Sequence, residues 1–170
     1  PAREAATRYL AATSDPATFK ELPPADASNA DAWLVAAERL AAKNPEQAVP
    51  LYEGLYRSSL PDRIRLAAFC GLIRCDTGRA ADRLAEGLSN ASPVWRGTTA
   101  RLAAQIPERA LKKLGAKLMA ALTPEGRLAL VNALVSAKRT AGAPLVRAAL
   151  ANEADAPTRL AAASGLGDLG

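Results

Sequence analysis

Four segments of the chain repeat at a nearly constant spacing, and this constrains the fold more than any other feature. The segments align without gaps over nine residues. They are IRLAAFCGL (64–72), WRGTTARLA (95–103), GRLALVNAL (126–134) and TRLAAASGL (158–166). Their second positions are Arg65, Arg96, Arg127 and Arg159, which lie 31, 31 and 32 residues apart. Such a period is typical of stacked units that each contain a pair of secondary-structure elements.

The residues around these segments mark helix ends. N-capping side chains and prolines favour the first turn of a helix, and they occur at Ser92-Pro93, at Thr123-Pro124 and at Asp155 with Pro157. We therefore expect helices to begin near 61, 93, 124 and 157. Helix-breaking residues should end these helices at Asp76–Gly78, Pro107 and Thr140–Gly142. A second leucine-containing helix is expected to follow at about 79–89, 108–122 and 143–152.

The composition favours an all-α fold. Alanine and leucine dominate, both are strong helix formers, and only 4% of the residues are aromatic. A chain of 170 residues can bury one substantial core. We expect one domain overall, with an N-terminal helix and connection at 1–30 and an array of about four helix pairs at 31–170, truncated at its C-terminus. In this array Pro50 is expected to kink the helix that follows Asn44-Pro45, or to mark a late start.

Positions counted from each repeated arginine form an apolar face. The offsets +1, +4, +7 and +8 share one side of a helix and are expected to form the core. In the last unit these positions are Leu160, Ala163, Leu166 and Gly167. The unit of Arg96 has only glycine and alanine there. We expect that unit to pack most closely or to be the least stable.

The offsets +5 and +9 form the opposite, mostly polar face. They are Cys70, Arg101, Asn132 and Ser164 in one column, and Arg74, Gln105, Ser136 and Asp168 in the other. Because stacked repeats place equivalent positions beside one another, the two columns predict a continuous strip. Its candidate binding residues are Arg74, Arg101, Gln105, Asn132 and Ser136. A solvated helix face without a partner is the open alternative.

The repeated arginines are interpreted as structural. Each lies in the first turn of its helix, and Asp62 and Asp155 are close in sequence to two of them, so that ion pairs across the stack can form. Four guanidinium groups at a regular spacing could also follow a phosphate backbone. We regard this as the weaker of the two interpretations.

The segments PDRIRLAAFCGL (61–72) and APTRLAAASGLGDLG (156–170) resemble HEAT repeats of the short bacterial type, related to PBS-lyase HEAT-like repeats. The pattern of that family is an acidic residue, an arginine, an alanine-rich helix and a Leu-Gly ending; the acidic position is missing ahead of Arg96. The resemblance covers about 31–170. It implies an α-solenoid, a right-handed superhelix of stacked antiparallel helix pairs, in which the second helix of each pair lines the concave side. On that mapping the polar strip would be concave. Tetratricopeptide repeats fit less well, because their period of about 34 differs from the spacing here.

The sequence offers little for catalysis. It has no histidine, which removes the usual general base and the Ser–His and Cys–His mechanisms. Cys70 and Cys75 should point to different sides of a helix, and we expect reduced structural thiols rather than zinc ligands. No enzyme activity, cofactor or metal is therefore expected. No run of about 18 apolar residues is present, so membrane insertion is not expected.

The net charge of +5 is concentrated in one region, because residues 96–147 contain ten Lys or Arg and two Asp or Glu. This favours an anionic partner. The alternative function is binding of a nucleic-acid backbone through a basic patch at Arg109, Lys112, Lys113 and Lys117. Few aromatic residues are present to stack on bases. The primary expectation is therefore a non-catalytic protein–protein interaction scaffold whose protein partner is unknown.

Two cellular locations are compatible with the sequence. A cytoplasmic location is favoured, and a removed leader is the alternative because the chain begins at Pro1.

Overall fold

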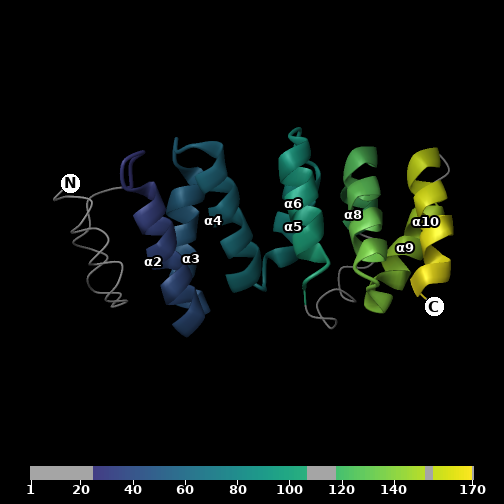
Figure 1. Ribbon diagram of the computed structural model, residues 1–170, viewed down its shortest axis with the longest axis horizontal. Helices are drawn as coiled ribbons and strands as arrows, with labels where there is room; N and C mark the ends of the chain where they lie inside the picture. Colours follow the sequence, from purple (N-terminus) through teal and green to yellow (C-terminus); the bar gives the residue numbers. More distant parts are fainter. Residues whose placement is uncertain (1–24, 107–117, 152–154, 170) are drawn as a thin grey trace. The chain divides into compact units, whose positions relative to one another are not determined.

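The computed structural model describes residues 25–106, 118–151 and 155–169. Within these ranges every regular element is an α-helix or a 3-10 helix (Figure 1), which confirms the predicted all-α class. The chain divides into two compact units, residues 1–80 and 81–170. Each unit is described by itself below.

The first unit contains α2 (Ala30–Lys43), α3 (Pro45–Arg57) and α4 (Asp62–Cys75), and each of these helices packs against the other two. Asn44 separates α2 from α3, and its side chain accepts a hydrogen bond from the Gln47 main-chain N–H at 3.3 Å. This cap explains why α3 already begins at Pro45. Pro50 lies inside α3, so the alternative that it marks a late start is wrong.

Tyr52 and Gly71 determine how closely α3 and α4 approach. Tyr52 is buried, and its ring occupies the space that a Cβ atom on Gly71 would need. Burial raises the pKa of the Tyr52 hydroxyl to about 12, so this side chain is neutral under ordinary conditions. Leu40, Leu55 and Leu72 lie in the same core cluster. The single glycine in α4 therefore allows an aromatic side chain into a core built mainly from alanine and leucine.

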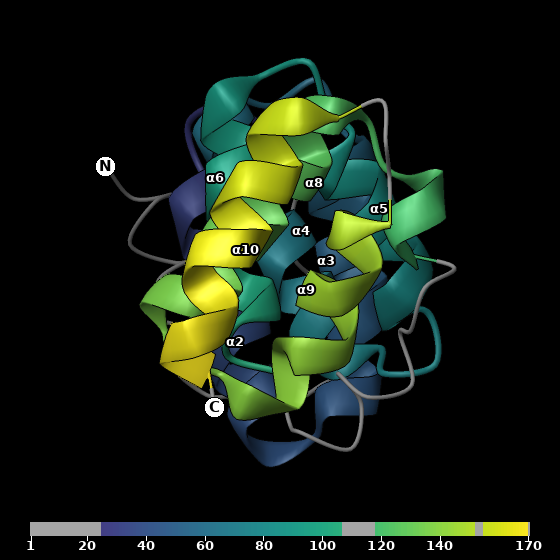
Figure 2. The same ribbon diagram turned by 90° about the vertical axis from the view of Figure 1, so that its right-hand side faces the viewer.

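The second unit contains α5 (Ala80–Leu88), α6 (Pro93–Ala103), α8 (Pro124–Ser136), the 3-10 turn η2 (Thr140–Gly142), α9 (Ala143–Leu150) and α10 (Ala156–Leu169). Figures 1 and 2 show α8 between α6 and α10, with α9 against α8 and α10. The helices α4, α6, α8 and α10 begin within one residue of the predicted starts. Of the predicted second helices, α5 and α9 are present. Most of the predicted helix at 108–122 lies outside the described residues.

Two of the three predicted N-caps form. The Thr123 hydroxyl accepts a hydrogen bond from the Gly126 N–H at 3.2 Å, and the Asp155 carboxylate accepts one from the Thr158 N–H at 3.2 Å. Ser92 precedes α6 but makes no capping bond through its side chain. Its own N–H instead donates to the Asn90 side chain at 2.9 Å. The expectation for Ser92 as a side-chain cap is therefore wrong.

Lys138, rather than a glycine, terminates α8. Its φ of 50° is left-handed. The Arg139 N–H donates to Leu134 O at 3.0 Å, and the Lys138 N–H donates to Val135 O at 2.8 Å, which is the Schellman pattern of a helix C-terminus. The breaker expected at Thr140–Gly142 forms the turn η2 before α9 instead, and Gly142 lies next to the Leu134 side chain.

The buried face of the repeated helices differs from the predicted stripe. In α10, Leu160 is 70% exposed and Ala163 and Gly167 are also exposed. The buried side of α10 contains Thr158, Ala162, Gly165 and Leu169 instead. The prediction is wrong for α10 because this helix packs through the face at offsets −1, +3 and +6, which meets α8 and α9.

The helix α8 is buried on two sides. A Cβ on Gly126 would meet the Leu88 carbonyl oxygen at 2.5 Å, and a Cβ on Gly165 of α10 would overlap the Val135 side chain. Residues at offsets +4 and +7 are buried as predicted, whereas Leu128 and Val135 are half-buried. A helix in the middle of a stack packs against a neighbour on each side. A prediction based on one amphipathic stripe therefore underestimates how much of its surface is buried.

Candidate functional site

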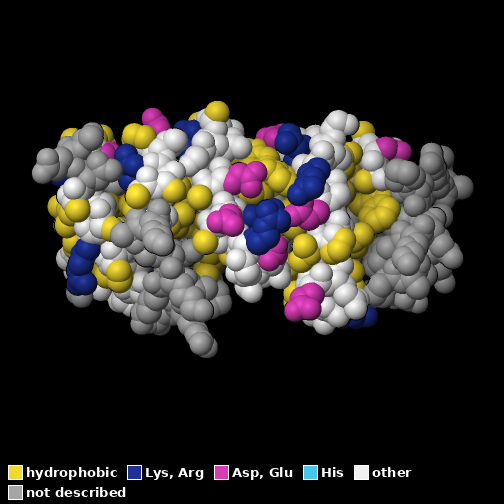
Figure 3. All heavy atoms as spheres, turned by 180° about the vertical axis from the view of Figure 1, so that it is seen from behind, with side chains coloured by type: hydrophobic (Ala, Val, Ile, Leu, Met, Phe, Trp, Pro, Cys, Tyr) yellow, Lys and Arg dark blue, Asp and Glu magenta, His cyan; other side chains and the backbone are white. Residues whose placement is uncertain are grey.

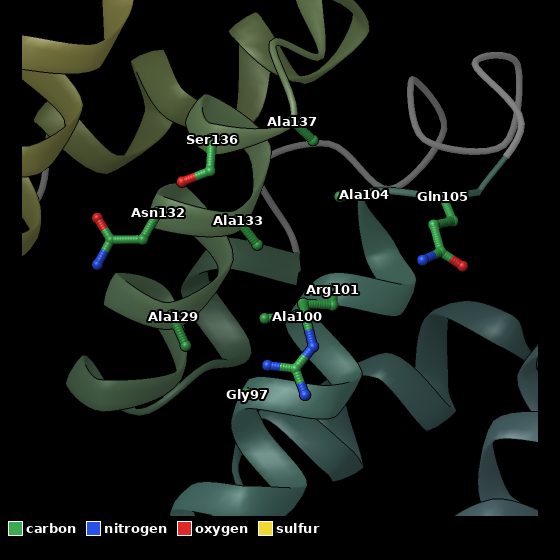
Figure 4. A pocket seen from close by; sticks show the side chains of 10 residues that line it. All are labelled: Gly97, Ala100, Arg101, Ala104, Gln105, Ala129, Asn132, Ala133, Ser136 and Ala137. Carbon is green, nitrogen blue, oxygen red and sulfur yellow. The ribbon is translucent and has the colours of Figure 1, made fainter.

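A groove lies between α6 and α8 in the second unit and has a volume of about 540 Å³. Figure 4 shows that alanine methyl groups from the two helices face each other across it. The polar residues of the lining are Arg101, Gln105, Asn132 and Ser136. Gly97, Ala100, Ala104, Ala129, Ala133 and Ala137 complete it.

The groove results from small residues at the contact between two repeats. Gly97, Ala100 and Ala104 occupy offsets +1, +4 and +8 from Arg96, where the repeats of Arg65 and Arg127 have larger apolar residues. From the opposite side, α8 contributes Ala129 and Ala133. Side chains of this size cannot fill the space between two neighbouring helices. The repeat of Arg96, which we expected to pack most closely or to be the least stable, therefore leaves a hollow on its surface.

Four of the five candidate binding residues come together at this groove. Arg101 lies on α6, Gln105 lies in the turn just after it, Asn132 and Ser136 lie on α8, and all four are exposed. Figure 4 shows Asn132 and Ser136 projecting from α8 on the side away from α6. The fifth residue, Arg74, is exposed on α4 in the first unit. The structure thus groups the predicted residues of α6 and α8, and their role in binding stays a prediction.

These residues do not lie on the second helices of the pairs. The resemblance implies that second helices line a concave side, but α6 and α8 are the first helices of their pairs. Ser164 and Asp168, which continue the two columns, are exposed on α10 and do not line the groove. That the strip lies on a concave side stays a prediction.

Arg101 is the charged residue of the groove lining. Its Nη2 donates a hydrogen bond to the Thr98 hydroxyl at 3.2 Å, one turn earlier on the same helix. No carboxylate of the described residues forms an ion pair with it. The guanidinium group is exposed, so most of its five N–H donors are directed to solvent.

Three of the four repeated arginines donate hydrogen bonds to main-chain carbonyls at or just beyond the end of the preceding helix. The acceptors are Tyr56 for Arg65 (3.3 Å), Asn90 and Ala91 for Arg96 (2.8 and 2.7 Å), and Leu122 for Arg127 (2.6 Å). The last carbonyls of a helix lack partners within it, and a cation there is favourable. These contacts support the structural interpretation of the arginines.

Arg127 also forms a buried ion pair. Its Nε lies 2.9 Å from Asp155 Oδ2, and the exposed fractions of the two side chains are 11% and 3%. Burial alone would raise the pKa of Asp155, but hydrogen bonds from Thr158 and Arg127 outweigh it and hold this pKa below its ordinary value. The pair joins the start of α8 to the start of α10, as expected for contacts between repeats.

Cys70 and Cys75 form no disulfide bond and are half-buried. Burial raises the pKa of the Cys75 thiol, so it is protonated at neutral pH. Across residues 25–106, 118–151 and 155–169, no group of three or more His, Cys, Asp or Glu side chains is arranged to hold a metal ion.

A second hollow of about 350 Å³ lies in the first unit, between α2 and α3. It is lined by Trp33 of α2 and by Pro50, Leu51 and Gly54 of α3, among others. Sequence reasoning missed it. The signal available was the spacing of Pro50 and Gly54, which places two residues with small or no side chains on one face of α3.

The basic patch proposed from the sequence cannot be placed. Arg109, Lys112, Lys113 and Lys117 all lie outside the described residues. On the face shown in Figure 3, acidic and basic side chains of the described part are intermixed with hydrophobic ones.

The comparisons with known proteins identify no relative: no family model, no curated protein and no solved structure matches this chain. In the described residues, no helix has the length and apolar character that crossing a membrane requires.

Proposed function

We propose that this protein is a non-catalytic protein–protein interaction scaffold, and that the groove between α6 and α8 binds a segment of its partner. The observation that carries the proposal is the grouping of Arg101, Gln105, Asn132 and Ser136 around one groove. These residues come from two successive repeats and occupy equivalent positions in them. Stacked repeats commonly bind their partners through surfaces built in this way.

The proposal includes an α-solenoid of HEAT-like repeats with a right-handed superhelix. Three features support it. The helices α6, α8 and α10 begin with the same arginine motif, α8 packs between the other two, and the Arg127–Asp155 pair connects successive repeats. Repeat proteins gain stability because each repeat buries apolar residues against its neighbours.

The groove has properties suited to a peptide. Its volume lies within the range of about 300–1,000 Å³ that is usual for binding pockets. Methyl groups on its floor let a peptide backbone come close, while amide and hydroxyl groups at its edges can hydrogen-bond to that backbone. Both walls are helices, so little ordering cost is expected when a segment binds.

Nucleic acid is the second candidate, favoured by the excess of basic residues between 96 and 147. The groove itself has one charged residue and no aromatic side chain in its lining. Backbone binding needs several cations along a path, and single-stranded binding usually needs aromatic stacking. A protein segment therefore fits the groove better.

The test is selection of binding peptides from a random dodecapeptide display library on the purified protein. Selected peptides are then titrated against the wild type, against a groove-filling Ala129→Leu/Ala133→Leu variant and against Ala163→Leu, which adds the same side chain to an exposed site on α10. The proposal predicts at least about tenfold weaker binding to the groove-filling variant and unchanged binding to Ala163→Leu. Circular dichroism confirms that both variants are folded.

Peptides that bind all three proteins equally, or a selection that yields none, would contradict the proposal. Labelled duplex DNA and single-stranded RNA are titrated in parallel across a salt series. Tight binding that falls steeply with salt would favour the nucleic-acid function instead.

A further inference from the structure

We propose that the segment bound between α6 and α8 is extended and acidic, and that its carboxylate pairs with Arg101. This inference rests on the proposed function and specifies the chemistry of the partner. Its first basis is the charge of the groove, since Arg101 is exposed and the lining contains no acidic residue. A carboxylate matches the planar fork of a guanidinium group and can accept two parallel hydrogen bonds from it.

The wider surroundings have the same sign. In residues 96–106 and 118–147 there are six Lys or Arg, and Glu125 is the acidic residue of these stretches. Arg127 is neutralised by Asp155, so five other basic residues and Glu125 remain in these stretches of the chain. Such a field attracts an acidic segment and disfavours a basic one.

An extended conformation follows from the polar groups at the groove. Gln105 carries an amide, and Asn132 and Ser136 carry an amide and a hydroxyl at the outer edge of the groove, on the side of α8 away from α6 (Figure 4). An extended chain presents main-chain N–H and C=O groups that need partners, whereas a helix satisfies most of its own. The polar residues of the groove therefore match an extended segment.

The length of the segment follows from the helix geometry. On this side the lining runs from Gly97 of α6 to Gln105, two residues past the end of that helix, which corresponds to about 12 Å at about 1.5 Å per residue. An extended chain covers that distance in about four residues. The floor is made of methyl groups, so the residues next to the carboxylate should have small side chains.

The experiment uses the peptides selected from the dodecapeptide library. Their sequences are scored for acidic residues, and each acidic peptide is compared with a version in which Glu or Asp is replaced by Gln or Asn. Every peptide is titrated by fluorescence anisotropy against the wild type, Arg101→Gln and Arg101→Glu. Arg159→Gln is the matched control, because Arg159 is an exposed arginine on α10 outside the groove.

The expected result is enrichment of acidic peptides whose affinity falls about tenfold when either the carboxylate or Arg101 is neutralised. Arg101→Glu should bind peptides in which the acidic residue is exchanged for arginine, and Arg159→Gln should behave as the wild type. Groove-dependent peptides without acidic residues, or insensitive to Arg101→Gln, would overturn this inference while the proposed function stands.

Two other outcomes reject the inference together with its basis. If no selected peptide depends on the groove, the proposed function fails and the acidic segment fails with it. If duplex DNA binds in an Arg101-dependent manner and no peptide does, the anion recognised is a phosphate rather than a carboxylate.

Discussion

Small residues control the contacts between helices in this protein. Gly71 allows the Tyr52 ring against α4, Gly165 allows Val135 against α10, and Gly126 lies against the main chain at the end of α5. Small residues also produce the groove, because Ala100 and Ala104 occupy positions that are larger apolar residues in the repeats of Arg65 and Arg127. Adding one methyl group to a glycine should therefore lower the stability of the protein at some positions and raise it at others.

Gly71→Ala should destabilise the first unit by about 1–3 kcal/mol, because the added methyl group overlaps the buried Tyr52 ring. Gly54→Ala is the matched control. It lies in α3, and nothing is within 4 Å of a Cβ there, so the exchange should stabilise the helix by about 0.5–1 kcal/mol. Urea unfolding of both variants measures the difference. Equal shifts in the same direction would show that Tyr52 does not occupy the position described.

Asp155→Asn should lower stability at neutral pH by about 3 kcal/mol, because it leaves the buried Arg127 charge without its partner. Asp31→Asn removes an exposed pair with Arg63 and should have little effect.

The same pair makes stability dependent on pH. Since the folded protein holds the pKa of Asp155 below its ordinary value, the contribution is complete above the unfolded pKa of about 3.9. It is lost as the pH falls through the lower folded value. Thermal unfolding of the wild type and Asp155→Asn between neutral and acid pH measures this contribution. The difference in melting temperature between the two proteins should become smaller below about pH 4. A difference in melting temperature that does not change with pH would contradict a stabilising ion pair between Arg127 and Asp155.

At the scale of the element, helix starts could be read from the sequence better than helix ends. Proline and a capping residue mark the start of α8 and α10, and both caps form. The end of α8 lacks this kind of signal, because Lys138 adopts the left-handed conformation usually taken by glycine. Local residue preferences indicate starts here, whereas packing of η2 and α9 determines the end.

Lys138→Gly should stabilise the protein by about 1 kcal/mol, because glycine adopts positive φ without the cost that a side chain adds. Lys138→Ala keeps the Cβ atom and should give no such gain, although it removes the same charge. Differential scanning calorimetry of the two variants measures the contrast. If alanine stabilises as much as glycine, the effect arises from charge and not from the backbone.

Thr123→Ala should cost about 1 kcal/mol, because the Gly126 N–H loses its capping acceptor. Ser92→Ala tests the same type of residue at the equivalent position of α6, where the side chain makes no capping bond, and should change stability little. Chemical unfolding measures both. A similar loss in the two variants would mean that Ser92 also caps its helix.

For the molecule as a whole, the Ala- and Leu-rich composition predicts the all-α class, and the repeat spacing with its capping residues predicts the order of the helices in the described residues. It also predicts which polar residues of α6 and α8 come together, because equivalent positions in neighbouring repeats are side by side. The groove itself could not be predicted. Its hollow depends on the distance between α6 and α8, and a periodic pattern defines faces but not distances.

The buried face of α10 could not be predicted for a related reason. An amphipathic pattern favours burial of the apolar Leu160 over that of the polar Thr158. In the structure Thr158 is buried and Leu160 is exposed. The contacts of α10 with α8 and α9, rather than side-chain size, decide which face is covered.

The most direct test of the account is NMR of the protein with labelled alanine methyl groups, titrated with a groove-dependent acidic peptide. The account predicts shifts concentrated at Ala100, Ala104, Ala129, Ala133 and Ala137, which line the groove. Ala162 of α10 and Ala36 of α2, which are buried elsewhere, should not move. Shifts centred outside the groove, or spread evenly over both units, would contradict the assignment of the α6–α8 groove as the binding site.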